Sequence, residues 1–361
     1  MKILYISNYK NNGGWSTAAE SHIKLLMHNH DVVAPHINLG SGLRDVSLGS
    51  NNLENIDICI QQVLPNFAIA DRRFKKNIIV YFSEASPLLP EWVRKINQFD
   101  CAVVSSLEMM KDAINSGVNI PIHIIPINID VQRILDHKDK PFEDKLRKAY
   151  PGECIFYTFG DLNNRKNLEE LLLAFYSNFY NKRVRLAIKL PVDNESATKY
   201  IDDISNKIFS ALRIFKDHSK YRKPIVISGY ASYEDMLDIH KMCDIYVTLS
   251  HSEAFSIPSI EAFLLDKLCI VPNHSAFREY LGSTLQIETN DAIPCMEMSA
   301  PDGLHTGCQY WNDLSFSSIL YQLNTAYDIW LTKKHNNNIS NLVKKLDLNK
   351  IQKLWEDVLL S

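Results

Sequence analysis

Two glutamates eight residues apart, Glu253 and Glu261, lie in a mostly apolar stretch that spans residues 249–272. Strand-like runs flank the pair and apolar residues recur at helical spacing between them, so the stretch predicts a strand, a loop, a helix and a second strand. Helical geometry places Glu261 on the inward face. A carboxylate there is unfavourable unless it is hydrogen-bonded, and a sugar diol would supply such bonds. The alternative is a loop glutamate followed by a solvated helix glutamate.

The start of this predicted helix has the features of an anion site. Ser256 is a suitable N-cap, and Pro258 fits the first turn, where a missing N–H costs nothing. The backbone N–H groups of residues 256, 257 and 259 are therefore expected to be free. Free amides at a helix start attract anions.

A second charged group, Arg165 and Lys166, lies between a predicted strand at residues 154–159 and a helical pattern. The helix macrodipole disfavours cations at this end of a helix. Their position is explained if both cations and the helix start face one shared anion, such as a pyrophosphate. A solvated basic loop is the alternative.

The run from Glu253 to Ala262, EAFSIPSIEA, resembles the E-x7-E signature of retaining glycosyltransferases with the GT-B fold, glycosyltransferase family 4 in particular. The family pattern is close to E-G-F-G-L-P-x-x-E-A. The matching positions are Glu253, Phe255, Pro258, Glu261 and Ala262. Ala254 and Ser256 stand where glycines are usual, and Ile257 replaces a leucine.

The resemblance implies a role for each of these residues. Glu253 faces the donor sugar, and Glu261 binds the ribose hydroxyls of the nucleotide. The loop amides at Phe255, Ser256 and Ile257 hold sugar hydroxyls and phosphate. Serine in place of glycine at position 256 narrows the sugar pocket, so the donor sugar is left undefined.

The second charged group resembles the family pattern G-R-x4-K-G/N, whose arginine and lysine hold the β-phosphate. Gly160, Lys166 and Asn167 match it, but Asp161 stands where the arginine is expected. We predict that Arg165 takes over that role.

The resemblance defines the predicted site as a whole. The predicted catalytic residues are Glu253, Lys166 and Arg165. The predicted donor-binding residues are Gly14, Lys166, Arg165, Asn167, Tyr230, Glu253, Phe255, Ser256, Ile257 and Glu261. No cofactor or metal is predicted. The chain has no D-x-D at a strand end, and Arg165 and Lys166 would do what a divalent metal does in other transferases.

The first half contributes a glycine pair and a glutamate. Gly13 and Gly14 separate a predicted strand from a helix and let the backbone approach a ligand closely, although a plain turn is the alternative. In the family this loop faces the donor phosphates or the acceptor, so Gly13 and Trp15 are assigned to the acceptor side. Glu84 follows a strand at its carboxyl end, where open α/β sheets bind ligands, and is predicted to touch acceptor or donor sugar.

Strand-like and helical segments alternate along the chain, as parallel α/β sheets require. Among the helical segments, residues 107–116 end before Gly117, residues 233–242 begin after Ser232, and residues 339–360 are predicted to form one helix. Residues 290–313 are expected to form a long loop. With the resemblance, the pattern predicts the GT-B fold: two Rossmann-like domains with parallel sheets facing a central cleft, and a C-terminal helix that crosses back. The predicted divisions are 1–130 (acceptor-side domain), 131–150 (linker), 151–335 (nucleotide-sugar-binding domain) and 336–361 (C-terminal helix).

The composition of the 361 residues is that of a globular protein, with 46% hydrophobic and 22% charged residues. A net charge of −3 gives no general attraction to nucleic acid.

Seven scattered cysteines without C-x-x-C predict buried thiols in a reducing cytosol, hence a cytoplasmic location. No apolar run reaches the roughly 20 residues that span a bilayer. The basic run at 72–76 leaves peripheral contact with anionic lipid open, with a solvated charge cluster as the alternative.

These features predict a retaining, metal-independent glycosyltransferase. Its donor would be a UDP- or GDP-sugar of the hexose type, and its acceptor a glycan or glycoconjugate, as in polysaccharide biosynthesis. One alternative is a catalytically inactive GT-B protein that binds nucleotide or stabilises a partner, and Asp161 and Ser256 favour it. Another is a nucleotide-sugar epimerase or hydrolase on the same fold. A dehydrogenase is disfavoured because G-x-G-x-x-G is absent.

Overall fold

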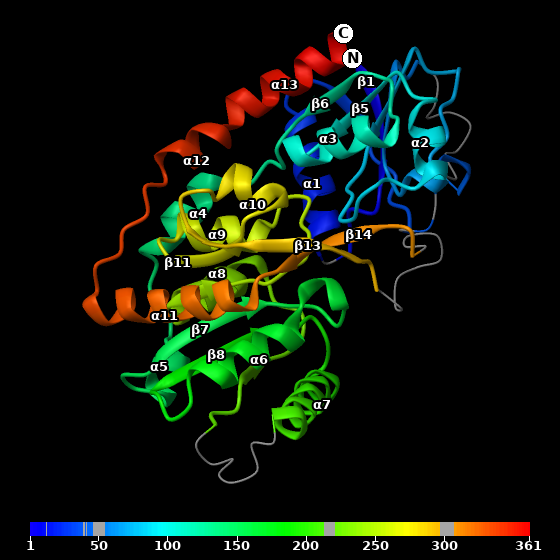
Figure 1. Cartoon of the computed structure of the whole chain (residues 1–361). Helices are drawn as coiled ribbons and strands as arrows, with labels where there is room; N and C mark the ends of the chain where they lie inside the picture. The colour runs from blue at the N-terminus through cyan, green and yellow to red at the C-terminus, as the bar shows by residue number, and fades with distance from the viewer. Residues whose placement is uncertain (12, 39, 41, 46–54, 213–220, 297–306) are drawn as a thin grey trace.

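The computed structural model describes residues 1–11, 13–38, 40, 42–45, 55–212, 221–296 and 307–361. They form two parallel six-stranded sheets and one antiparallel strand pair. Figure 1 shows the N-terminal half in blue and cyan at the top and the second half, mostly green, below it. This is the predicted α/β architecture.

The first sheet has the strand order β2-β1-β3-β4-β5-β6. Its central strands are runs of buried residues, as a parallel sheet covered on both faces requires. The strands are β1 Lys2–Ser7, β2 Asp31–Val33, β3 Ile58–Gln62, β4 Lys76–Val80, β5 Cys101–Val104 and β6 Ile122–Ile124. The helices of this half are α1 Gly14–Leu26, α2 Pro90–Ile96 and α3 Leu107–Ser116, with short 3-10 turns η1 Leu43–Asp45 and η2 Pro65–Phe67.

The second sheet has the order β12-β11-β10-β7-β8-β9. Its strands are β7 Cys154–Phe159, β8 Val184–Lys189, β9 Ile225–Ile227, β10 Ile245–Val247, β11 Leu268–Pro272 and β12 Leu285–Ile287. Its helical elements are η3 Asn164–Lys166, α6 Leu168–Asn178, α7 Asn194–Leu212, α8 Tyr233–Met242, α9 Ile257–Leu264, α10 Ser275–Tyr280 and α11 Phe316–Thr332. Since β7 and β10 are neighbours, the segments that follow them emerge side by side.

The segment predicted as a linker contains two helices, α4 Val131–Lys138 and α5 Lys145–Ala149. Each begins at an aspartate whose side chain caps it: Asp130 accepts from the amide of Arg133, and Asp144 from that of Arg147. Both helices contact α8, and α4 also contacts α9. This segment is therefore packed on the second half, and the proposed domain divisions remain a prediction.

The C-terminal segment crosses from the second half back to the first, as the fold prediction has it. The prediction of one helix over residues 339–360 is wrong, because α12 (Ser340–Lys345) and α13 (Leu348–Leu360) are separate. Asp347 caps α13 by accepting from the amide of Lys350. The break lets Leu342 pack in the second half while Trp355 packs against the first sheet. Figure 1 shows α13 beside the first half, with both termini close together.

The prediction of a long loop at residues 290–313 is partly wrong. Strands β13 (Thr289–Pro294) and β14 (Tyr310–Leu314) pair antiparallel, while residues 297–306 lie outside the described part of the chain. These two strands mix polar and apolar residues without a clear alternation, so the sequence gives no strand signal for them. In Figure 1 this pair runs across the centre of the molecule toward the first half.

The basic run at 72–76 is largely neutralised within the fold. Arg73 pairs with Asp71 at 2.6 Å and Lys75 with Asp57 at 2.7 Å. Lys76 donates to the carbonyl oxygen of Val358, at 2.5 Å. These bonds favour the solvated charge cluster over a lipid-binding patch. Among the described residues, no helix has both the length and the apolar character needed to cross a bilayer.

Candidate functional site

The loop between β10 and α9 is buried where the two halves meet. Ala254 packs with the core of the first half, whereas Phe255 packs with the core of the second. The interface is also hydrogen-bonded, because the Ser105 hydroxyl donates to the carbonyl oxygen of Ala254 at 2.8 Å. The Tyr280 hydroxyl donates to the carbonyl oxygen of Ser105 at 2.6 Å. The glutamate signature therefore lies at the junction between the two halves.

Ser256 does not cap α9 in the predicted way. Its backbone is left-handed, with φ 63° and ψ 65°, a conformation that glycine adopts far more readily than serine. Its hydroxyl consequently bonds the Ser259 hydroxyl at 2.7 Å, and no side-chain cap forms. The amide of Ser259 is also engaged, since it donates to the carbonyl oxygen of Ser256 at 3.1 Å. Of the three amides expected to be free, those of residues 256 and 257 have no hydrogen-bond partner within the described part of the chain and are left for a ligand.

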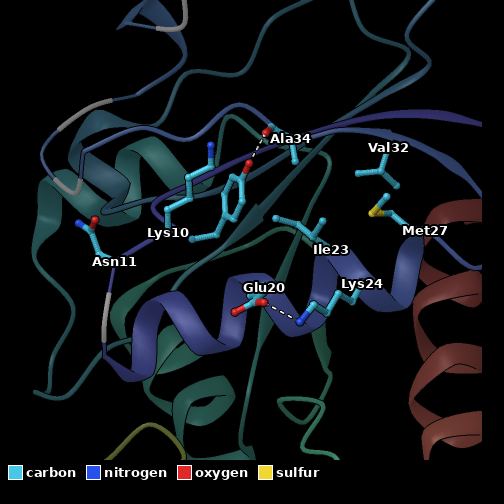
Figure 2. A pocket seen from close by; sticks show the side chains of 9 residues that line it. Lys10, Asn11, Glu20, Ile23, Lys24, Met27, Val32 and Ala34 are labelled. Carbon is cyan, nitrogen blue, oxygen red and sulfur yellow. Dashed lines mark hydrogen bonds and ion pairs between the residues drawn. The ribbon is translucent and has the colours of Figure 1, made fainter. Parts of the chain in front are cut away.

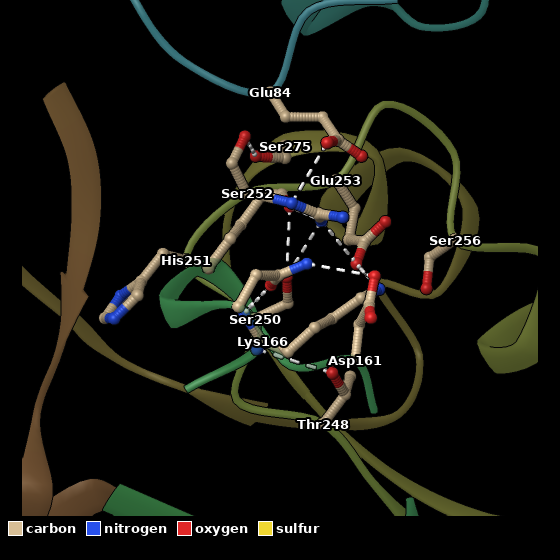
Figure 3. Close-up of polar contacts among 12 residues, drawn as sticks. Glu84, Asp161, Lys166, Thr248, Ser250, His251, Ser252, Glu253, Ser256 and Ser275 are labelled. Carbon is tan, nitrogen blue, oxygen red and sulfur yellow. Dashed lines mark hydrogen bonds and ion pairs between the residues drawn. The ribbon is translucent and has the colours of Figure 1, made fainter. Parts of the chain in front are cut away.

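Arg165 and Lys166 converge on Glu253. Both cations lie on η3, directly before α6, as the sequence predicts. The Lys166 ammonium lies 2.5 Å from Oε1 of Glu253, and Nη1 of Arg165 lies 2.9 Å from the same oxygen. Figure 3 shows Lys166 and Glu253 facing each other, with Ser250, Ser252 and Ser256 nearby. The structure thus joins two sequence motifs that are more than eighty residues apart.

This contact controls the ionisation of Glu253. Burial alone raises the pKa of this carboxyl group, but the charges of Lys166 and Arg165 outweigh burial and bring its pKa down to about 2. The Glu253 side chain is only 7% exposed. It is therefore an ionised carboxylate at neutral pH, held in place by two cations.

Glu84 reaches the same cluster from the first half. Its Oε2 lies 2.9 Å from Nε of Arg165. Figure 3 shows Glu84 above the cluster, on a chain segment separate from those of Lys166 and Glu253. Glu84 was predicted to touch a sugar, and the structure places it on the edge of the charge cluster, bound to Arg165.

Asp161, at the position where the family has arginine, adds another carboxylate. Its Oδ1 accepts from the amide of Leu162 at 2.8 Å, and its Oδ2 from the side chain of Asn163 at 3.1 Å. Together with Glu84 and Glu253 it outnumbers the two cations of the cluster. A diphosphate would therefore meet cations that are already paired.

Glu261 lies on the predicted inward face of α9 and is 2% exposed. Its Oε2 lies 3.4 Å from Nε2 of His240, and its Oε1 has no hydrogen-bond partner in the described part of the chain. Nδ1 of His240 lies 2.7 Å from the Tyr157 hydroxyl. Sequence reasoning missed both His240 and Tyr157, since neither belongs to a motif and only the tertiary packing of α8 on the second sheet places His240 beside Tyr157.

Several predicted donor residues have side chains engaged elsewhere. Phe255 is buried and packs edge-on against Tyr280, with ring centroids 4.8 Å apart. Asn167 adopts a left-handed conformation before α6, and its amide group donates to Glu170 at 2.5 Å. Ligand contacts at these positions would be made by the backbone or would require a different side-chain conformation.

Tyr230 is 70% exposed, on the segment between β9 and α8. The residue before it, Gly229, is held by a hydrogen bond: the ammonium of the buried Lys189 donates to its carbonyl oxygen. Lys189 also donates to the carbonyl oxygen of Leu190 at 3.2 Å. Lys189 thus braces the loop that carries Tyr230.

The glycine pair lies at the start of α1. Gly13 is the N-cap with φ 128°, a conformation that favours glycine, and a Cβ at Gly13 or Gly14 would meet no atom within 4 Å. Trp15 packs edge-on against Phe82, with centroids 5.1 Å apart, two residues before Glu84. The loop is thus open, and Trp15 ties it to the segment that carries Glu84.

The strand pair β13–β14 connects the site to the first half. Tyr310 and Ser86 exchange two backbone hydrogen bonds, at 2.7 and 3.2 Å. The indole Nε1 of Trp311 donates to the carbonyl oxygen of Glu84 at 2.9 Å, and the Trp311 ring stacks on His251 at 5.6 Å. This strand pair therefore holds the Glu84 segment over the cluster.

A hollow of about 660 Å³ in the first half is lined by residues of α1, of β2 and of the segment that follows β1. Figure 2 shows Lys10, Asn11 and Glu20 among its lining side chains. None of the predicted site residues lines it. We therefore do not assign the donor to this hollow.

Comparisons with known proteins agree with this geometry. Residues 212–289, which contain Tyr230, Glu253 and Glu261, match the family model described as Glycosyl transferases group 1. No curated protein sequence matches the chain.

Solved structures match over almost the whole chain. An E. coli structure bound with UDP-2-fluoro glucose has a TM-score of 0.68 at 12% identity and covers 99% of both chains. A structure of trehalose-6-phosphate synthase has the same TM-score at 11% identity and covers 100% of this chain and 99% of that one. HepE of Anabaena, in complex with UDP and glucose, has a TM-score of 0.65 at 14% identity and also covers 99% of both chains. The N-terminal domain of a Candida albicans trehalose-6-phosphate phosphatase has a TM-score of 0.61 at 13% identity, covering 100% of this chain and 93% of that one. The chain therefore has the GT-B fold.

Proposed function

We propose that this protein is a retaining glycosyltransferase that takes a nucleotide-diphosphate sugar as donor and a glycan or glycoconjugate hydroxyl as acceptor. The observation that carries the proposal is the buried ion pairing of Arg165 and Lys166 with Glu253. This cluster combines cations that could bind a diphosphate with a carboxylate that could bind sugar hydroxyls, and it lies at the junction of two Rossmann-like halves. The test is to replace Lys166 by alanine: the proposal predicts that both nucleotide binding and sugar transfer are lost.

The diphosphate would bind where Lys166 and Arg165 now contact Glu253. Each cation carries several N–H donors, so it keeps a bond to the carboxylate while it turns another toward phosphate oxygens. The free amides at the start of α9 would add further donors. We propose that these groups act without a divalent metal.

The sugar and the nucleoside would lie on either side of the diphosphate. Glu253 would accept hydrogen bonds from hexose hydroxyls, and Glu261 would accept them from the ribose. The unpaired Oε1 of Glu261 supports this, because a buried carboxylate oxygen is unfavourable until a donor reaches it. The backbone near Tyr230 would border the base. Uracil is the first candidate, since the E. coli and Anabaena structures hold UDP-containing ligands.

The transfer step would replace the bond between the anomeric carbon and the phosphate oxygen by a bond to the acceptor oxygen, on the same face of the sugar. The departing phosphate would take the acceptor proton, so no side chain is needed as nucleophile. Arg165 and Lys166 would stabilise the charge that develops on the leaving diphosphate. A further solved structure of trehalose-6-phosphate synthase, with a TM-score of 0.67, comes from work on enzymatic glycosyltransfer with retention, and this supports the stereochemistry proposed.

The acceptor would approach from the first half, past Gly13, Trp15 and Glu84. Glu84 already touches Arg165, so this approach leads directly to the cluster. We propose a cytoplasmic enzyme of glycan or polysaccharide synthesis that binds no nucleic acid.

One observation favours a second candidate, a catalytically inactive GT-B protein that binds nucleotide or stabilises a partner. Asp161 replaces the family arginine and adds negative charge to the place where phosphates would bind. A thermal-shift screen of the pure protein against UDP, GDP, ADP and their sugar conjugates, with and without divalent metal, tests binding. Transfer or donor hydrolysis by the responding protein identifies the enzyme. Binding without either reaction supports the inactive protein, and no response to any nucleotide overturns the proposed donor site.

A further inference from the structure

We infer that His240, held by Tyr157, positions the Glu261 carboxylate and thereby sets how strongly the protein recognises the ribose hydroxyls of its nucleotide. The inference rests on the proposed function, because it takes Glu261 as the ribose-binding group. Neither His240 nor Tyr157 belongs to the two charged motifs.

The three residues form one chain of polar contacts through the core of the second half. Tyr157 lies on β7, His240 on α8 and Glu261 on α9. The Tyr157 hydroxyl lies 2.7 Å from Nδ1 of His240, and Nε2 of His240 lies 3.4 Å from Oε2 of Glu261. The three residues are at most 2% exposed, so bulk water does not separate them.

The contacts at its two ring nitrogens set the tautomer of the imidazole. Nε2 of His240 faces an acceptor oxygen of Glu261, so the ring proton lies on Nε2 and Nδ1 accepts from the Tyr157 hydroxyl, whose pKa burial raises well above its ordinary value. Burial also lowers the pKa of His240, which leaves the ring neutral. A neutral imidazole that accepts at Nδ1 carries its proton on Nε2. That N–H is the one nearest Glu261.

Aromatic packing prevents the imidazole from turning away. The ring of Phe159 lies 4.7 Å from the ring of His240, and that of Tyr246 lies 6.1 Å away. With Oε2 beside His240, the other oxygen of Glu261 is the one that lacks a partner in the described structure. Tyr233 is a second neighbour of Glu261: burial and the charge of this carboxylate raise its pKa. A buried carboxylate with one oxygen beside His240 and the other unpaired suits a pair of neighbouring hydroxyls.

The first half offers a matched control. Tyr5 on β1 contacts Nδ1 of His22 on α1 at 3.1 Å, and both residues are buried. This pair resembles the strand-to-helix contact of Tyr157 and His240, except that the Tyr5 hydroxyl also donates to Oε1 of Gln62 at 2.7 Å. Within the described residues neither Nε2 makes a hydrogen bond of normal geometry, but Nε2 of His240 lies 3.4 Å from a carboxylate oxygen, whereas no ion pair involves His22 there. Tyr5→Phe therefore removes a comparable buried hydroxyl without affecting a ligand-binding carboxylate.

The test compares a nucleotide with its counterpart lacking the ribose hydroxyls. Isothermal titration calorimetry measures Kd for UDP and for 2′,3′-dideoxy-UDP with wild type, His240→Asn, Tyr157→Phe and Tyr5→Phe. If UDP does not bind, the GDP or ADP pair that binds wild type is used. Thermal unfolding verifies that each variant is folded. If His240→Asn does not fold, the conclusion is drawn from Tyr157→Phe alone.

We expect wild type and Tyr5→Phe to prefer the ribonucleotide by about tenfold or more, the factor that a lost hydrogen bond to a charged group gives. In His240→Asn and Tyr157→Phe this preference should shrink several-fold, through weaker binding of the ribonucleotide at unchanged binding of the dideoxy compound. A preference that stays at the wild-type value in both variants, or that falls equally in Tyr5→Phe, overturns the positioning role and leaves the proposed function intact. Failure of wild type to bind any of the nucleotides overturns the proposed function itself, and the inference with it.

Discussion

Arg165 and Glu84 join the two halves of the molecule through an ion pair of 2.9 Å. Nη1 of the same guanidinium contacts Glu253 at 2.9 Å, so one side chain links the first half to the loop before α9. GT-B halves that open and close around a ligand would have to break and remake this contact. Phosphate binding at Arg165 would therefore be coupled to the position of the first half.

Lys166→Ala should abolish sugar transfer while the protein stays folded. The lysine is the cation nearest Glu253, and loss of one group that stabilises the leaving diphosphate lowers kcat by about 100-fold or more. Transfer assays with the donor found in the nucleotide screen measure this, with circular dichroism as the check on folding. Lys207→Ala, which removes a lysine paired with Glu169 outside the cluster, is the control. Wild-type turnover in Lys166→Ala would rule out the phosphate role.

Asp161→Asn should tighten donor binding. The substitution removes one negative charge beside Arg165 and Lys166 and keeps the shape of the side chain. We expect Kd for the nucleotide-sugar to fall by about threefold to tenfold at low ionic strength, and by less in high salt, because salt screens charges. Calorimetric titrations at two salt concentrations measure it. Asp202→Asn, at a carboxylate paired with Lys223 away from the cluster, should leave Kd unchanged, and an unchanged Kd in Asp161→Asn would contradict the prediction.

Glu253→Gln should remove a pH dependence of stability. The folded protein lowers the pKa of Glu253 from 4.5 to about 2, so this carboxylate stabilises the fold above pH 4.5. The contribution, up to about 3 kcal/mol, is lost as the pH falls toward 2, because the unfolded chain takes up the proton first. Urea unfolding between pH 6 and pH 2 should therefore give a flatter curve for Glu253→Gln over this acidic range than for wild type. Parallel curves for the two proteins would show that Glu253 is not held by its cations.

Trp311→Phe should loosen the contact between β14 and the first half. The change keeps a ring to stack on His251 but removes the hydrogen bond to the carbonyl oxygen of Glu84. We expect a loss of about 1 kcal/mol in the free energy of unfolding. Chemical denaturation measures it. Trp330→Phe, at a ring stacked on Tyr327 and remote from Glu84, serves for comparison, and acceptor affinity should change only in Trp311→Phe.

Trp355→Ala should destabilise the protein strongly. This indole is 1% exposed and fixes α13 against the first sheet. Truncation of a buried tryptophan costs about 3–5 kcal/mol, from lost burial and the cavity left behind. Thermal and urea unfolding should show the loss, and Trp355→Phe should recover part of it. A loss below about 1 kcal/mol would mean that α13 contributes little to holding the first half.

Segments with local signals could be predicted from the sequence closely. Helix α3 has the predicted bounds, because Ser106 caps its start and Gly117 adopts the left-handed conformation at its end. Helix α8 also has the predicted bounds, and Ser232 forms a capping box with Asp235. The cap predicted at Ser256 was wrong, since a left-handed backbone at this position redirects the hydroxyl. Caps and periodicity depend on neighbours within a few residues, and the sequence shows those directly.

The sequence by itself determined which side chains could do chemistry: two cations before a helix, two glutamates eight residues apart, and an alternating pattern that requires two parallel sheets. Only the tertiary structure decided which of them meet. The pairing of β7 with β10 brings Lys166 to Glu253, the packing of α8 against α9 brings His240 to Glu261, and β14 carries Trp311 to Glu84. These contacts join residues between 21 and 227 positions apart. Their geometry follows from how sheets, helices and the two halves pack, because no local rule in the chain encodes a distance across a core.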